Sequence, residues 1–153
     1  MQNPPADISA SQYPFSDAEV KIRRARKHFA ELETEICAFA ESRPATFDVR
    51  IIEWTGGPQR VEIDFHLGRL PPAEIGAIVG DIIHNLRSAL DLMACDLVRL
   101  IEPGADVSNV YFPFCNHVDD LDKMIRRRNF HRAGPQAVAL LLELKPYRGG
   151  NVF

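Results

Sequence analysis

The sequence lacks the features that mark secreted, membrane and nucleic-acid-coating proteins. Three cysteines at scattered positions are an odd number, so no disulfide framework is predicted. No apolar run approaches the roughly 18 residues that span a bilayer, and the N-terminus has neither the basic start nor the apolar centre of a signal peptide. A net charge of -3 provides no overall attraction to nucleic acid. We therefore expect a cytoplasmic protein that does not engage a membrane.

The motifs of nucleotide-dependent, hydrolytic and zinc enzymes are also missing. The sequence contains no G-x-x-x-x-G-K-[ST], G-x-G-x-x-G, G-x-S-x-G or H-E-x-x-H. Cys115 and His117 stand close together, with His131 downstream, but this spacing matches no standard zinc site. We therefore expect neither a cofactor nor a bound metal.

What remains is the composition of an ordinary globular domain. Its 153 residues are 46% apolar and 25% charged, which suits one domain with a single core. We expect a flexible tail over residues 1–15, which hold three prolines, and one domain over residues 16–153. The fold class that we predict is mainly α, an antiparallel bundle of about four helices with one inserted β-hairpin.

The first helix and the hairpin are predicted from a change of period. Ser16 to Glu19 matches a capping box, so a helix should begin there and end near Glu41. From about residue 46 to residue 67 the apolar residues alternate with polar ones, which predicts a hairpin with one wet face that must pack on helices or another strand. Gly56 and Gly57 suit its turn. The predicted core stripe of the first helix is Ile22, Ala25, Phe29, Leu32, Ile36 and Phe39.

The segment 70–102 reads as one long helix with two unlike faces. One face carries a full-length apolar stripe, and the opposite face carries small or polar residues where Lys and Glu are usual. Because Gly76 and Gly80 weaken a helix, we interpret this second face as a close contact with a neighbour. The stripe is Ile75, Val79, Ile82, Leu86, Ala89, Met93, Leu97 and Leu100, and the predicted interaction face is Gly76, Ala77, Gly80, His84, Ser88 and Cys95.

The polar residues on this helix have two interpretations. His84 and Ser88 are one turn apart, and so are Arg87 and Asp91, so each pair can touch. In the first interpretation they form a reactive group, and the candidate catalytic residues are His84, Arg87 and Asp91. In the second interpretation they form a structural network, in which Arg87 and Asp91 form an ion pair and His84 is a hydrogen-bonded histidine at a helix or subunit contact.

The rest of the chain is predicted to complete the bundle. A helix is expected from about His117 to Arg128, and Gly134-Pro135 opens a last helix that is apolar nearly all round and should be buried. Two basic clusters are candidate contacts for RNA or for an acidic protein, with a solvated helix surface as the alternative. They are Arg23, Arg24, Arg26 and Lys27, and Arg126, Arg127 and Arg128.

Two segments carry a family resemblance. The segment Gly80 to Asp91, GDIIHNLRSALD, resembles the G-D-x-x-H-N-L-R-S-A-L-D signature of a family of uncharacterised bacterial proteins, and Pro146 to Gly150 is similar to its P-Y-x-G-G motif. Members often have His after the final Asp, where this chain has Leu92, and they continue well past P-Y-x-G-G. The chain therefore resembles the N-terminal half of these proteins. The resemblance implies no reaction.

A second resemblance is to helical ribonuclease domains of the HEPN class. These pair an Arg and a His four to six residues apart on a bundle helix to cleave RNA without metal. Three pairs have this spacing here, namely Arg23 with His28, Arg60 with His66 and Arg126 with His131, of which the last lies in the basic run RRRNFHR, whereas Arg87 leads to Leu92. This resemblance implies an RNase of a defence or toxin–antitoxin system.

Three functions follow from these patterns. The first is a non-enzymatic interaction or assembly module, a homodimer that uses the small-residue face of the 70–102 helix. The second is the HEPN-like RNase, or a degenerate relative of one. The third is a small-ligand pocket between the helices.

Overall fold

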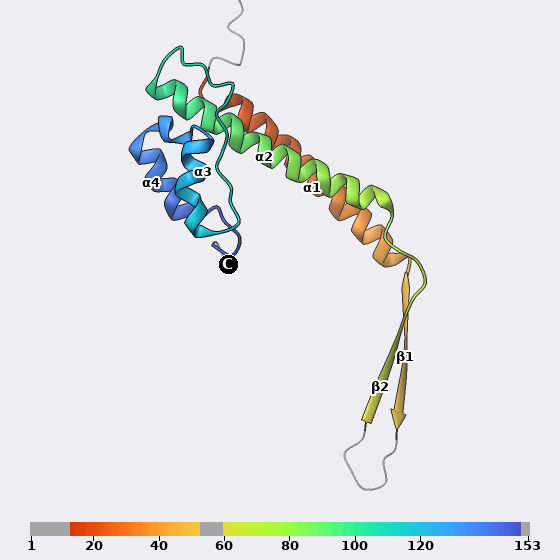
Figure 1. Cartoon of the computed structure of the whole chain (residues 1–153). Helices are drawn as coiled ribbons and strands as arrows, with labels where there is room; N and C mark the ends of the chain where they lie inside the picture. Colours follow the sequence, from red (N-terminus) through yellow and green to blue (C-terminus); the bar gives the residue numbers. More distant parts are fainter. Residues whose placement is uncertain (1–12, 53–59, 151–153) are drawn as a thin grey trace, which may run out of the picture. The chain divides into compact units, whose positions relative to one another are not determined.

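The fold is mainly α with one inserted β-hairpin, as predicted. The computed structural model describes residues 13–52 and 60–150, and its order of elements is shown in Figure 1. The predicted tail up to residue 12 and the predicted turn at residues 55–58 lie outside these ranges. The elements are α1 (Ser16–Glu41), β1 (Ala45–Ile52), β2 (Arg60–Leu67), α2 (Ala73–Ile101), the 3-10 helix η2 (Val118–Asp120), α3 (Leu121–Arg127), the 3-10 helix η3 (Phe130–Ala133) and α4 (Gly134–Leu144).

The chain packs as two compact units. The first unit joins Met1–Ala25 to Ile83–Phe153, and the second comprises Arg26–Ile82. The first therefore holds the start of α1, most of α2 and everything that follows, and the second holds the hairpin with the adjoining helical segments. Over the described ranges, no helix is both long enough and apolar enough to cross a membrane.

In the first unit, the beginning of α1 is capped by a carboxylate from α2. The Phe15 N–H donates to Asp96 Oδ2 at 2.9 Å, and the Phe15 carbonyl accepts the first helical bond, from Glu19 N at 2.9 Å. Helix α1 begins at Ser16 as predicted, but Phe15, with φ of 69°, holds the cap position assigned to Ser16. The negative charge of Asp96 near the helix N-terminus is favourable. A local sequence pattern does not reveal a cap from a distant helix.

The predicted stripe of α1 is wrong at every second position. Ala25 is buried, but Ile22, Phe29 and Ile36 are 39%, 52% and 48% exposed. The covered positions instead recur every seventh residue, the first two buried and the last two half-buried, with other half-buried positions between them, so the covered stripe is narrower than the predicted one. These covered positions are Ala18, Ala25, Leu32 and Phe39.

The stripe of α2 is displaced in the same way. Ile82 and Ala89 are buried as predicted, whereas Val79 and Leu86 are 37% and 39% exposed. Asn85, which no apolar pattern could place inside, is 8% exposed. Because apolar residues also stand on both sides of the covered stripe, the sequence alone does not show which face of α2 is covered. The buried positions of this part of α2 are Ile78, Ile82, Asn85 and Ala89.

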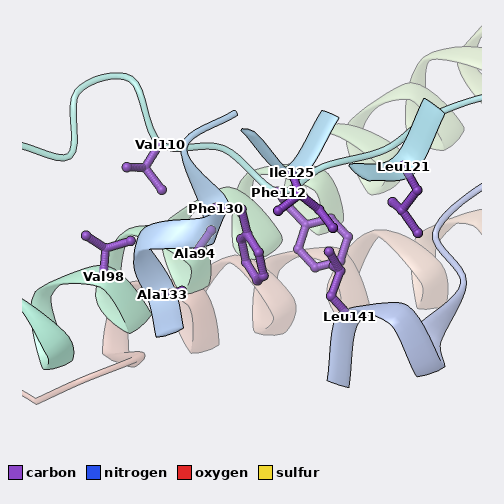
Figure 2. Close-up of a cluster of buried hydrophobic side chains, with 9 residues drawn as sticks. All are labelled: Ala94, Val98, Val110, Phe112, Leu121, Ile125, Phe130, Ala133 and Leu141. Atoms are coloured by element: carbon purple, nitrogen blue, oxygen red, sulfur yellow. The ribbon is translucent and has the colours of Figure 1, made fainter. Parts of the chain in front are cut away.

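The core of the first unit lies where α2, α3, η3 and α4 meet the segment that follows α2 (Figure 2). Phe112 is in its middle, with its ring centroid 5.9 Å from that of Phe130. The prediction that the last helix is buried all round is wrong: in α4, Leu141 is 1% exposed, but Leu140 and Leu142 are 61% and 45% exposed. The core cluster is Ala94, Val98, Val110, Phe112, Leu121, Ile125, Phe130, Ala133 and Leu141.

The hairpin of the second unit has one charged face and one apolar face. Strands β1 and β2 are antiparallel, with Phe47 opposite Phe65 and Val49 opposite Ile63. Alternation therefore puts all the apolar partners on one side. We call this side the hairpin face: Ala45, Phe47, Val49, Ile51, Val61, Ile63, Phe65 and Leu67. The other face carries the ion pairs Arg50–Asp64 at 2.6 Å and His66–Asp48 at 3.4 Å.

Candidate functional site

The two segments that resemble the bacterial family meet at the extended segment Phe112 to Asn116. From α2, Asp91 Oδ1 accepts a hydrogen bond from the Phe112 N–H at 2.9 Å. From the end of the chain, the Pro146 carbonyl accepts one from the Cys115 N–H at 3.2 Å, within an isolated parallel bridge between Cys115 and Tyr147. The resemblance motifs thus share one structural neighbour, although about 55 residues separate them.

Arg87 and Asp91 have different partners. The guanidinium carbon of Arg87 lies 5.1 Å from the centroid of the Phe114 ring, a cation–π contact. Asp91 is directed to the backbone of Phe112 instead. The predicted Arg87–Asp91 ion pair is not among the ion pairs of the described residues. The polar face of α2 therefore holds the Phe112 to Asn116 segment in place.

The Asp91 hydrogen bond should contribute measurably to stability. We expect Asp91→Ala to lower the free energy of unfolding by about 1.5 kcal/mol, since it leaves a part-buried N–H without its acceptor. Urea denaturation followed by circular dichroism measures this. Asp91→Asn is the matched control, because its carbonyl oxygen can still accept the bond, and it should lose less than half as much. Equal losses in both variants would contradict the role of the hydrogen bond.

A hollow of about 460 Å³, which we call the polar hollow, opens beside this segment in the first unit. Arg87 reaches it from α2, while Lys123 and Arg127, one turn apart, reach it from α3. The basic groups of this lining outnumber its single carboxylate, that of Asp120. The lining residues are Arg87, Phe114, Cys115, Asn116, His117, Asp120, Lys123, Met124 and Arg127.

A second hollow of about 460 Å³ shares Phe114 and Cys115 with the lining of the polar hollow. Its lining is mostly apolar and includes Leu90 and Tyr147. Gly150 closes this end of the chain tightly: a Cβ added there would lie 2.5 Å from the Lys145 carbonyl oxygen and 2.5 Å from the Tyr147 ring. Steric exclusion of a Cβ thus explains why the last position of the segment that resembles P-Y-x-G-G is glycine.

The thiols of this unit are poor candidates for a nucleophile. Burial raises the pKa of the Cys95 thiol, which lies 3.5 Å from the Val110 carbonyl oxygen and donates to it. Desolvation likewise raises the pKa of Cys115, whose thiol donates to the His117 carbonyl at 3.2 Å. Because the thiolate is the reactive form, a raised pKa disfavours covalent catalysis at both.

The other predicted site residues are dispersed. His84 is exposed and is not part of the lining of the polar hollow, so the structure brings Arg87 there without His84 or Asp91. Ser88 and Cys95 are half-buried, and Cys95 faces its own chain. Gly76, Ala77 and Gly80 are exposed, with no atom within 4 Å of a Cβ built on either glycine. The catalytic assignment of His84, Arg87 and Asp91 stays a prediction.

The predicted basic clusters differ in their surroundings. Arg23, Arg24, Arg26 and Lys27 are all exposed on α1. On α3, Arg126 and Arg127 are both exposed, and Arg127 lines the polar hollow. Arg128, directly after α3, is half-buried, with its guanidinium carbon 5.4 Å from the centroid of the Tyr111 ring. Sequence reasoning missed Phe114, Asn116 and Lys123. The only signal for Lys123 was its spacing of four residues from Arg127, which places two positive charges on one face of a helix.

Comparisons with protein-family models, with curated proteins and with solved structures give no match. In the parts of the chain that the structure describes, no three His, Cys, Asp or Glu side chains are placed to hold a metal ion together.

Proposed function

We propose that this chain is a non-enzymatic assembly domain that forms a homodimer through the hairpin face. The observation that carries the proposal is exposure: Phe47, Val49, Ile51, Val61, Ile63, Phe65 and Leu67 are 50% to 65% exposed. A two-stranded hairpin is marginally stable in water unless its apolar face is covered. A contiguous apolar surface on a folded protein is characteristic of an interaction site.

The area suits a second copy of the chain. Seven side chains that each expose about half of their surface present roughly 100 Å² apiece, or of the order of 700 Å² together. A standard protein interface buries about 800 Å² per partner. The hairpin face alone therefore comes close to the area that a stable dimer needs.

The face is also self-complementary. Its aromatic pair, Phe47 and Phe65, lies toward one end, and the smaller pair Ile51 and Val61 lies toward the other. A two-fold axis that lies in the contact plane, perpendicular to the strands and through the middle of the face, would set Phe47 and Phe65 of one copy over Val49 and Ile63 of its partner, and Ala45 and Leu67 over Ile51 and Val61. This is the isologous arrangement of most dimers. The ion pairs Arg50–Asp64 and His66–Asp48 are on the opposite side, so this packing buries no charge.

The small-residue face of α2 supports the same function. Gly76, Ala77 and Gly80 belong to the same unit as the hairpin, and the space beside both glycines is open. Each glycine costs about 1 kcal/mol in a helix relative to alanine, and the open space beside both glycines shows no contact within this chain that would compensate for this cost. A partner helix that approaches closely would explain why glycine stands at both positions.

Light scattering coupled to size exclusion tests the dimer. Wild type should elute with about twice the chain mass of 17.2 kDa, and Ile63→Lys should weaken association at least tenfold by burying a charge in the contact. Thr46→Lys adds the same charge to the opposite face and is the matched control, which should keep the dimer. A wild-type monomer at tens of micromolar, or equal weakening by both variants, would refute the proposal.

Gly80→Leu tests the helix face separately. Because the space beside Gly80 is open, the larger side chain should leave the helical circular dichroism unchanged and weaken the dimer. An unchanged dimer mass would remove the α2 face from the interface and leave the hairpin face as its whole extent.

A further inference from the structure

The polar hollow of the first unit is a second, independent feature of the molecule. Arg87, Lys123 and Arg127 bring three positive charges to it from two helices, and the lining contains one carboxylate, Asp120. None of the three cations forms an ion pair within the described ranges 13–52 and 60–150. Lys123 and Arg127 are both exposed and repel weakly across one helical turn, and a bound anion would relieve this repulsion.

We propose that the polar hollow binds a small phosphorylated molecule. A guanidinium presents paired donors that match two oxygens of a phosphate, and a lysine ammonium adds a compact positive charge. Arg87 is held over the Phe114 ring at 5.1 Å, so little side-chain freedom is lost when it takes up a ligand. In this proposal the phosphate contacts Arg87, Lys123 and Arg127, the three cations of the lining.

The rest of the lining accepts an uncharged organic part. Phe114 and Met124 are half-buried and apolar, and the Asn116 side chain offers both a donor and an acceptor. A volume of about 460 Å³ lies within the range of small-molecule sites, about 300 to 1,000 Å³. The hollow therefore has the size and chemistry for a molecule such as a nucleoside monophosphate.

A small molecule fits this lining better than a length of RNA. A polynucleotide is held by a row of cations and by aromatic rings on which its bases stack. Here Asp120 places a carboxylate on the lining, and the Phe114 ring already contacts Arg87 on one side and the Phe112 ring, 4.8 Å away, on another. One phosphate satisfies the three cations, whereas a continuous phosphate backbone would also meet Asp120.

Titration calorimetry in a low-salt buffer free of phosphate tests the proposal with three probes. Adenosine monophosphate and inorganic phosphate should both bind the full chain, and adenosine, which lacks the charge, should bind at least tenfold more weakly than its monophosphate. The double variant Lys123→Gln and Arg127→Gln should reduce the affinity for adenosine monophosphate at least tenfold. Arg126→Gln is the matched control, because Arg126 is an exposed arginine on the same helix outside the hollow.

Four results would overturn the inference. The first is that wild type binds neither phosphate probe at millimolar concentration, and the second is that adenosine and its monophosphate bind equally. Equal weakening by Arg126→Gln and by the double variant would show attraction to a diffuse positive surface. A single-stranded RNA oligonucleotide that binds more tightly than adenosine monophosphate, with its affinity lowered by both variants, would assign the basic residues to nucleic acid.

Discussion

Replacement of Leu141 by alanine is expected to lower the free energy of unfolding by about 3 kcal/mol. Leu141 is 1% exposed and belongs to the cluster that joins α4 to α2, α3 and η3 (Figure 2). Truncation removes buried methyl groups and leaves a cavity that the surrounding rings of Phe112 and Phe130 fill only in part. The size of the loss measures how far α4 contributes to the core.

Leu140 provides the matched control for this experiment. It precedes Leu141 on α4 but is 61% exposed, so Leu140→Ala removes the same atoms without opening a cavity. Urea denaturation followed by circular dichroism should show a change below about 0.5 kcal/mol for Leu140→Ala. Similar losses for the two variants would mean that α4 does not present Leu141 to the core.

Replacement of Gly150 by alanine is the second large change that we expect, at about 2 kcal/mol. The new Cβ would lie 2.5 Å from the Lys145 carbonyl oxygen, a backbone atom that cannot turn away as a side chain can. Relief requires the turn around Tyr147 to move, which would break the hydrogen bond from Cys115 N to Pro146 O. Hydrogen exchange of the Cys115 amide should therefore accelerate at least tenfold.

Gly149→Ala distinguishes this clash from ordinary backbone strain. Gly149 has φ of +77°, which alanine tolerates poorly, but an added Cβ there meets no atom within 4 Å. We expect Gly149→Ala to cost about 1 kcal/mol and to accelerate exchange at Cys115 less than Gly150→Ala does. The reverse order of exchange rates would contradict the packing of Gly150 against Tyr147.

The interaction face predicted on α2 divides into two parts with different partners. At its C-terminal end, Cys95 bonds to the segment that follows α2 within the same chain, as Asp91 nearby also does. Toward its N-terminal end, Gly76 and Gly80 stay open. One small-residue pattern along one helix thus corresponds to an internal contact and to an open surface, for which we propose a dimer contact. Sequence spacing could not separate them, because it does not show where the covering segment ends.

The sequence by itself determined the four α-helices, the hairpin and their order, but not the 3-10 helices η2 and η3, the first of which occupies the start of the helix expected from about His117. The period of two over residues 46–67 could only be a hairpin, because the same residues on a helix would scatter their apolar side chains over every face. The start of α1 and the length of α2 followed from local signals in the same way, and the hairpin register brings the apolar residues to one side.

Only the tertiary structure decided which faces are covered and where the charges meet. On α1 and α2, apolar residues occupy the covered stripe and also the exposed positions beside it. The sequence is therefore compatible with more than one rotation of each helix about its axis, and packing selects one. Arg87, Asn116 and Arg127 line one hollow because α3 packs onto the core beside the segment after α2. No sequence spacing predicts that residues so far apart in the chain lie close together, since their proximity depends on how the core between them packs.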